Sequence, residues 1–315
     1  MYRLKAGLAN PAWGAINAMN CLMDELKSEI SPVTHRVALG IEYDGSKFAG
    51  WQIQEGRATI QAALEQALSA VADQTVRVVC AGRTDAGVHG LAQVVHFDTT
   101  ALRTDYSWQR GGNAGLPPDI RITFSKSVPA DFHARTSAIA RHYRYTILNR
   151  SAASALDVGR VTWTPYALDE GAMAEGAQHL IGDHDFSAFR AQSCQSKSPR
   201  RIMHFIRVAR EGDRIHIDVC ANAFVHHMVR NIAGTLMAVG AGKQPPEWVR
   251  EVLAGRDRAL AGVTAPPDGL YFAGVLYPDR FGFPGYPIFD HLPPGTTRFI
   301  PPESPEAVSL AENTR

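Results

Sequence analysis

The feature that most constrains the fold of this chain is a succession of alternating apolar strands and amphipathic helices that occurs twice. In the first series, Leu39, Ile41 and Tyr43 alternate with their neighbours as in a half-buried strand. Thr59 is placed to cap a helix whose apolar stripe continues to Val71. Further strands are expected at residues 76–80, 92–98 and 120–128.

The second series begins near Arg141 and has a comparable length. Its periodicity predicts strands at residues 142–148, 202–210, 214–221 and 270–277, and helices at residues 169–181, 225–239 and 246–255. Two similar mixed α/β halves in which strands outnumber helices predict an α+β protein, with largely antiparallel sheets packed together.

The two halves are assigned to residues 35–140 and 141–277. Residues 1–34 are expected to be a disordered extension, or the chain starts at Met23. Their first residues loosely resemble a signal peptide, but asparagines and a proline dilute the apolar region, which argues against export. Residues 278–315 carry eight prolines and no periodicity, so we expect an irregular or disordered tail.

Composition narrows the class of protein without identifying it. The net charge is only +1, but arginines far outnumber lysines, and arginine suits phosphate binding and base stacking better. The four cysteines are scattered, so neither a disulfide framework nor a zinc knuckle is expected. No apolar run is long enough to span a bilayer, and we expect a cytoplasmic protein with no membrane partner.

The segment Gly82–His89 lies between two of the expected strands. Its glycines permit a tight backbone path, and Asp85 stands at the apex with Arg83 close by. A nearby positive charge would keep this carboxylate ionised and available for chemistry. An aspartate between glycines is more often a turn former, so the loop alone identifies no site.

Two stretches concentrate positive charge without any acidic residue. Residues 132–156 hold four arginines and two histidines interleaved with aromatics, which suits a nucleic-acid groove. The alternative is a solvated basic strand with Tyr143 or Tyr145 in the core. Residues 187–210 hold six positive charges, Arg190 and Arg201 among them, and favour a polyanionic ligand.

The stretch Asn222–Asn231 enters the helix expected at 225–239. Its adjacent histidines, His226 and His227, would lie about 100° apart on a helix and so form a poor metal pair. They are more simply interpreted as hydrogen-bonded boundary residues. Arg230 falls near the buried stripe, where a charge needs a partner, and Asp85 is a candidate for that partner.

Taken in order, these stretches resemble the tRNA pseudouridine synthase A family over roughly residues 36 to 277. A single short motif would be weak, whereas this ordered set is highly specific. The matching motifs are Ile41–Ser46, Gly50–Gln52, Cys80–His89, Gln93–Phe97, Phe132–Arg135, Tyr143–Tyr145, Asp185–Phe189, Asn222–Asn231 and Gly269–Tyr271.

The resemblance implies a function and a set of partners. It implies isomerisation of uridine to pseudouridine at positions 38 to 40 of the tRNA anticodon arm, after the base has been flipped out of its stack. The enzyme would be a homodimer that needs no cofactor and no metal, with its catalytic cleft between the two halves.

The resemblance also implies roles for individual residues. Asp85 matches the family's nucleophile, and Arg230 matches the basic residue that pairs with it. Tyr143 matches the tyrosine that stacks on the target base and is a candidate proton carrier, and Leu270 matches an apolar residue of the base pocket. The expected RNA contacts are Arg83, Arg103, Arg135, Arg190 and Arg201, of which the last two come from the second basic stretch.

Two other classes of function stay open. A metal-dependent phosphohydrolase would use Asp85, His89, His96 and Asp98 as ligands, and a chelator would abolish its activity. A catalytically silent tRNA-binding protein would keep only the basic surface. Every matched site position carries the expected chemistry, which favours the enzyme.

Overall fold

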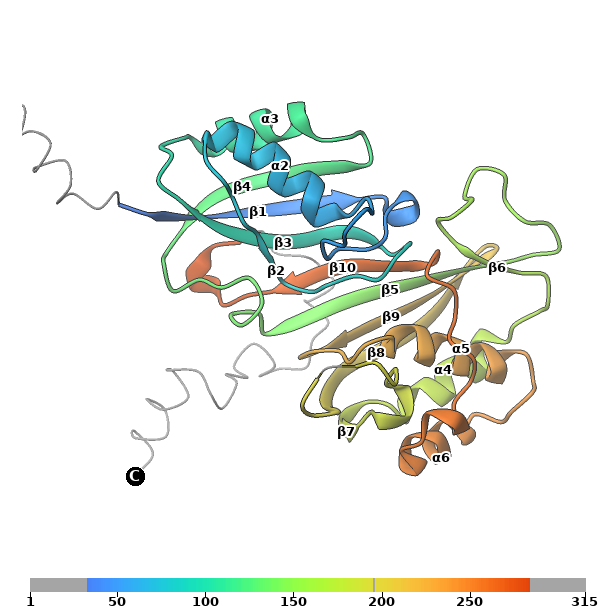
Figure 1. The fold of residues 1–315 in the computed structure, drawn as a ribbon. Helices are drawn as coiled ribbons and strands as arrows, with labels where there is room; N and C mark the ends of the chain where they lie inside the picture. The colour runs from blue at the N-terminus through green and yellow to red at the C-terminus, as the bar shows by residue number, and fades with distance from the viewer. Residues whose placement is uncertain (1–32, 195, 284–315) are drawn as a thin grey trace, which may run out of the picture. The chain divides into compact units, whose positions relative to one another are not determined.

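The computed structural model of the chain describes residues 33–194 and 196–283 (Figure 1). The described strands are β1 (His35–Tyr43), β2 (Val79–Cys80), β3 (His89–Thr99), β4 (Ile120–Val128), β5 (Ala140–Asn149), β6 (Thr162–Thr164), β7 (Gly182–Asp185), β8 (Arg200–Glu211), β9 (Arg214–Ala221) and β10 (Leu270–Leu276). The described α-helices are α2 (Ile60–Ala72), α3 (Asp105–Gly115), α4 (Glu170–Gln178), α5 (Met228–Gly240) and α6 (Trp248–Gly255).

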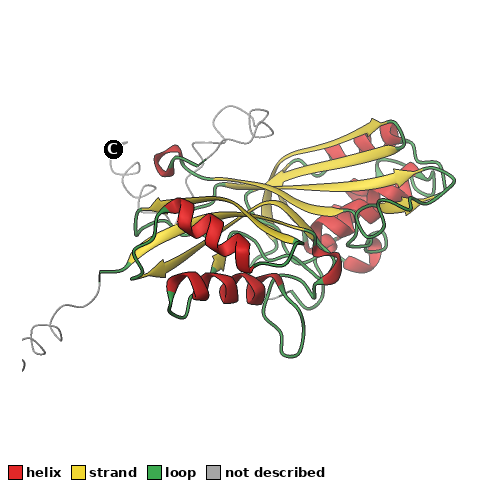
Figure 2. Cartoon of the chain, turned by 90° about the horizontal axis from the view of Figure 1, so that it is seen from above, coloured by secondary structure: helices red, strands yellow, loops and turns green. Residues whose placement is uncertain are grey.

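These strands form one sheet (Figure 2), whose main path runs β4-β1-β3-β10-β5-β9-β8-β7 (Figure 1). Neighbouring strands are antiparallel except for the pairs β3–β10 and β5–β6. The predicted α+β class with a largely antiparallel arrangement is therefore confirmed. The two halves do not form separate sheets, because β3 and β10 pair and make the sheet continuous.

The N-terminal half packs α2 and α3 against β1, β3 and β4. Thr59 caps α2 as its position predicts, by accepting a hydrogen bond from the backbone N–H of Ala62. Strand β4 has the predicted bounds, whereas β2 is shorter than the strand expected at residues 76–80. Helix α3 was not expected; Thr104 caps it, and its Trp108 is fully buried.

The C-terminal half packs α4 and α5 against β5, β8 and β9, and α6 packs against α4. Strands β8 and β9 form the predicted hairpin, and β10 closes the series as expected. Helix α5 begins at Met228, later than the predicted residue 225. This later start leaves Val225 to His227 in the segment before the helix.

The junction between the halves lies at the end of the Gly82–His89 loop. Strands β3 and β10 pair at two positions, Tyr271 with His89 and Phe272 with Gly90. The His89 ring stacks on Tyr271 with 4.6 Å between centroids. The continuous sheet therefore brings this loop beside the C-terminal half.

The packed part of the chain extends past residue 277, where the irregular tail was expected to begin. A short 3-10 helix spans Asp279–Phe281, and the ring of Phe281 is buried 5.0 Å from that of Phe132. Residues 1–32 and 284–315, on which the other predictions of disorder fall, lie outside the described residues.

Two further findings concern the described residues alone. Cys80, Cys194 and Cys220 are free thiols. No described helix combines the length and the apolar character that a bilayer span requires.

Candidate active site

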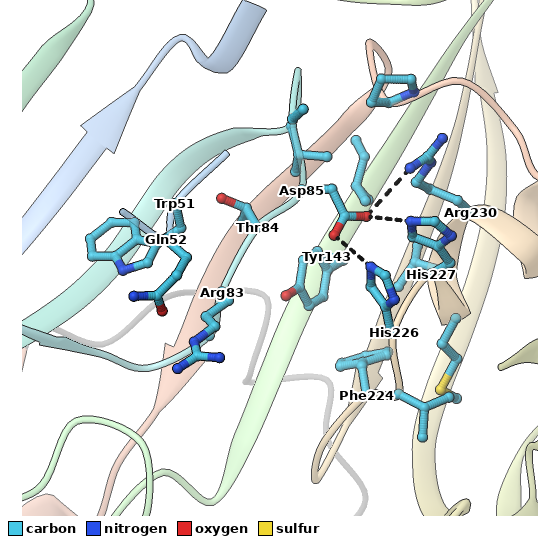
Figure 3. Close-up of a pocket in the computed structure, with 18 of the residues that line it drawn as sticks. Trp51, Gln52, Arg83, Thr84, Asp85, Tyr143, Phe224, His226, His227 and Arg230 are labelled. Atoms are coloured by element: carbon cyan, nitrogen blue, oxygen red, sulfur yellow. Dashed lines mark hydrogen bonds and ion pairs between the residues drawn. The ribbon is translucent and has the colours of Figure 1, made fainter. Parts of the chain in front are cut away.

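A cleft of about 940 Å³ opens where the Gly82–His89 loop faces the segment before α5 and the first turn of that helix (Figure 3). The loop contributes Gly82 to Ala86 and Val88, and the facing segment contributes Ala223 to Arg230. Tyr143 from β5 and Leu270 from β10 line the same cleft. Residues from both halves of the sequence therefore build it.

Uncharged hydrogen bonds hold the loop on the N-terminal side. The buried side-chain amide of Gln93 donates to the Gly82 carbonyl at 2.6 Å and accepts from the Gly82 N–H at 3.3 Å. The Trp51 N–H donates to the Thr84 carbonyl, and the Thr84 hydroxyl bonds the Tyr43 hydroxyl, both at 2.9 Å. These contacts fix the backbone that leads into the apex.

Gly50 shows how closely the chain packs behind the loop. Its φ is +94°, and a Cβ built there would lie 2.8 Å from the Thr84 carbonyl oxygen. A side chain at this position would displace the loop, so the backbone approach requires glycine.

The Asp85 carboxylate, about a quarter exposed, meets three basic side chains (Figure 3). Arg230 Nη1 lies 3.4 Å from Oδ2, which is the contact that the sequence suggested. His227 Nε2 lies 3.3 Å from Oδ2, and His226 Nε2 lies 3.2 Å from Oδ1. All three partners belong to the C-terminal half.

Arg230 is held by its surroundings as well as by Asp85. Its Nε donates to the Ala265 carbonyl at 2.8 Å, and the Ala265 N–H donates to the Arg230 carbonyl at 3.1 Å. The side chain is only 15% exposed. Because its Nε is bound to the Ala265 carbonyl and its Nη1 points at Asp85, the Arg230 guanidinium holds its positive charge in a fixed place beside the carboxylate.

The interpretation of the two histidines as divergent helix residues is wrong. They precede α5, and His227 has a left-handed backbone with φ of 61°. The two rings lie 4.0 Å apart and converge on Asp85. Burial lowers the pKa of His227, the Asp85 charge opposes this shift, and His226 and Arg230 add to it.

Tyr143 lies in the cleft between two aromatic neighbours. Its ring is edge-on to Phe224 at 4.9 Å and to Phe272 at 5.1 Å between centroids. Burial raises the pKa of the Tyr143 hydroxyl, and the charge of Asp85 raises it further. The hydroxyl is therefore protonated at neutral pH. Leu270 is buried beside it in the cleft wall.

The predicted RNA-contacting arginines fall into two groups. Arg83 and Arg135 line the cleft and are exposed, and Arg83 points away from the carboxylate (Figure 3). Arg103, Arg190 and Arg201 do not line it. Arg103 donates to the Val71 and Leu102 carbonyls.

Arg190 and Arg201 hold the loop that precedes β8. Arg190 Nη2 donates to the carbonyls of Cys194 and Ser196, at 2.6 and 2.8 Å. Arg201 donates to the Ser198 carbonyl and the Ser196 hydroxyl. Arg201 also borders a second hollow of about 440 Å³, together with Arg135.

Arg141, which the sequence analysis did not single out, connects the two sides of the cleft. Its Nη1 donates to the Asn222 carbonyl at 2.7 Å, and its Nη2 donates to the Arg135 carbonyl. Burial lowers the pKa of this guanidinium. In the sequence, the sign of this role is that Arg141 lies within residues 132–156, a stretch without acidic residues.

The ligand set of the metal-dependent alternative does not come together. His89 Nδ1 accepts from the Gly45 N–H, His96 Nδ1 accepts from the Ala134 N–H, and Asp98 pairs with Arg36. Among the described residues, the one group with a geometry that could hold a cation is Asp85 with His226 and His227. Arg230 shares Oδ2 of that carboxylate, and its positive charge opposes a bound cation.

Comparison with known proteins identifies the family of the chain. A family model described as tRNA pseudouridine synthase matches residues 40–137 and 177–278. A tRNA pseudouridine synthase A from Methylococcus capsulatus is 60% identical over 266 residues, which are 84% of this chain and 98% of that protein. One from Nitrosococcus oceani is 59% identical over 249 residues, 79% of this chain and 96% of the relative.

The protein is thus an isomerase of the pseudouridine synthase class. The chain belongs to the tRNA pseudouridine synthase family.

Proposed function

We propose that this chain converts uridine to pseudouridine at positions 38 to 40 of the tRNA anticodon arm, with Asp85 as the nucleophile. One observation carries the proposal: a carboxylate in a cleft, beside a buried tyrosine and leucine, and paired with a fixed arginine. The cleft volume of about 940 Å³ is ample for a nucleoside flipped out of its stem.

The side chains match the chemistry of the isomerisation. A carboxylate oxygen of Asp85 bonds to the sugar C1′ while the N1–C1′ bond breaks and N1 keeps the electron pair. The uracil then turns, the C5–C1′ bond forms and the carboxylate leaves. Alternatively, the carboxylate assists formation of a glycal. Arg230 holds Oδ2 of the carboxylate in place in both routes.

Tyr143 is proposed to stack on the uracil and to carry the proton that C5 loses. Because its raised pKa keeps the hydroxyl protonated, it acts as a relay. Its oxygen takes the C5 proton while its own proton passes to water at the open side of the cleft, and N1 of the turned uracil takes up a proton in return. Leu270 packs on the other atoms of the base, and together the two side chains exclude water while the uracil is free.

The partners are also part of the proposal. Arg83 and Arg135 would bind phosphates beside the flipped nucleotide, because both line the cleft and are exposed. Arg103, Arg190 and Arg201 remain proposed contacts farther along the RNA. We further propose a cytoplasmic homodimer that works without a cofactor.

Release of tritium from tRNA labelled at uridine C5 tests the proposal. The wild type should release tritium, and Asp85→Asn should lower release at least about a thousandfold while tRNA binding is retained. Undiminished release by Asp85→Asn would refute the nucleophile. Binding without release by the wild type would favour the silent binding protein, and release abolished by a chelator would favour the metal-dependent alternative.

A further inference from the structure

We propose that His226 and His227 divide the two oxygens of Asp85 between them. His227, with Arg230, holds Oδ2 throughout the reaction as a positioning residue. His226 covers Oδ1 in the free enzyme and yields that oxygen to the substrate. This inference rests on the proposed role of Asp85.

The Oδ2 side is built from fixed groups. His227 Nε2 and Arg230 Nη1 lie 3.3 and 3.4 Å from Oδ2, and both residues are mostly shielded from solvent. The His227 carbonyl accepts the first hydrogen bond of α5, from Asn231 N–H at 2.9 Å. The left-handed backbone of His227 aims its ring at the carboxylate. A non-glycine residue holds this conformation only when its surroundings impose it.

The Oδ1 side is more open. The His226 side chain is 39% exposed, against 28% for His227. Its Nε2 lies 3.2 Å from Oδ1, while its Nδ1 has a long contact of 3.4 Å to the Ser193 hydroxyl. Ser193 belongs to the irregular segment before β8 and lines the cleft. His226 therefore covers Oδ1 and is the more exposed of the two histidines.

The chemistry requires such a division. The oxygen that approaches the sugar must offer a lone pair, and a donor on that oxygen lowers its reactivity. Donors on the other oxygen keep the carboxylate aimed at the sugar. Oδ2 has two such donors, whereas Oδ1 has only His226 among the described residues. Oδ1 is therefore the reactive oxygen, and His226 is displaced when the ribose arrives.

The matched variants His226→Asn and His227→Asn test this division. Asparagine tolerates a left-handed backbone, so His227→Asn retains the local chain path, but its shorter side chain cannot reach the carboxylate. Single-turnover tritium release over a range of tRNA concentrations gives the rate at saturation and the half-saturating concentration separately. Thermal unfolding checks that each variant folds.

The two variants should change different kinetic quantities. His227→Asn should lower the saturating rate about 10- to 100-fold and change the half-saturating concentration less than twofold. His227→Gln, whose amide can still reach Oδ2, should recover part of the rate. His226→Asn should lower the half-saturating concentration about threefold, because the substrate no longer displaces a hydrogen bond.

Several results would overturn the division. Equal falls in the saturating rate, a larger fall for His226→Asn, or no effect of His227→Asn would each refute it. If the wild type is active and Asp85→Asn is inactive in the same experiment, each of these results refutes the division alone, and the proposed function stands. An inactive wild type or an active Asp85→Asn would remove the proposed function and this inference together.

Discussion

The two sides of the cleft are built in different ways. The Gly82–His89 loop comes from the N-terminal half and is fixed by uncharged groups, chiefly the Gln93 amide and the Trp51 N–H. The facing segment comes from the C-terminal half and supplies all three basic partners of Asp85 that are found among the described residues. One side places the carboxylate, and the other supplies the basic side chains that contact it.

This difference makes the site depend on the junction between the halves. Neither half alone holds both Asp85 and the basic side chains that contact it. The β3–β10 pairing aligns them, and His89 adds contacts from its Nε2 to the carbonyls of Gly159 and Asp268. The charged contacts should therefore affect chiefly the rate of isomerisation, whereas the uncharged contacts should also affect the free energy of unfolding.

The charged side should show the largest effect. Arg230→Gln removes the fixed cation from Oδ2 and is expected to lower single-turnover tritium release about a hundredfold, with tRNA affinity little changed. Arg230→Lys should recover only part of the rate, because a single ammonium cannot aim at Asp85 while also holding the Ala265 carbonyl as the guanidinium does.

A control and a contrary result complete this experiment. Arg250, an exposed arginine on α6, gives the matched control Arg250→Gln, which should keep the wild-type rate. If Arg230→Gln raised the half-saturating tRNA concentration and left the saturating rate unchanged, Arg230 would bind RNA and would not tune Asp85.

The elements of the fold follow from the sequence wherever the periodicity is strong. Strand β4 and the β8–β9 hairpin illustrate this, because alternation and a turn define them locally. Helix α3 could not be found this way, since it contains Gly111, Gly112 and Gly115 and little apolar pattern. Gly112 lies so close to Ile122 that a Cβ would be 2.4 Å from its Cδ1. Tertiary packing outweighs the low helix propensity there.

The site was predictable in part. Asp85, Tyr143, Leu270 and Arg230 stand in motifs whose order resembles one family, and they do line one cleft. The convergence of the two histidines was not predictable, because it depends on a left-handed residue that is not glycine. Local sequence preference gives no warning of such a conformation.

The uncharged side should show an intermediate effect. Gln93→Leu leaves the N–H and carbonyl of Gly82 without their partner, which should cost about 2–4 kcal/mol of unfolding free energy. The loosened loop should lower the saturating rate about tenfold. Denaturant unfolding measures the first effect and tritium release the second. Stability lost with an unchanged rate would mean that the amide does not position Asp85.

The smallest effect should separate arginines that meet phosphate from those that hold the fold. Arg135 is exposed at the cleft, so Arg135→Gln should weaken tRNA binding about three- to tenfold. It should also reduce by about one the slope of the logarithm of the binding constant against the logarithm of the salt concentration. The Arg190 guanidinium already donates to two backbone carbonyls, so Arg190→Gln should weaken tRNA binding less and leave the salt dependence of binding nearly unchanged.

Fluorescence anisotropy of labelled tRNA at several salt concentrations measures both slopes, and the saturating rate should stay near the wild-type value in both variants. Equal reductions of the slope would place Arg190 on a phosphate, and its contacts to Cys194 and Ser196 would then have to break when RNA binds. The C-terminal side of the cleft would in that case bind the RNA backbone as well as contact the Asp85 carboxylate.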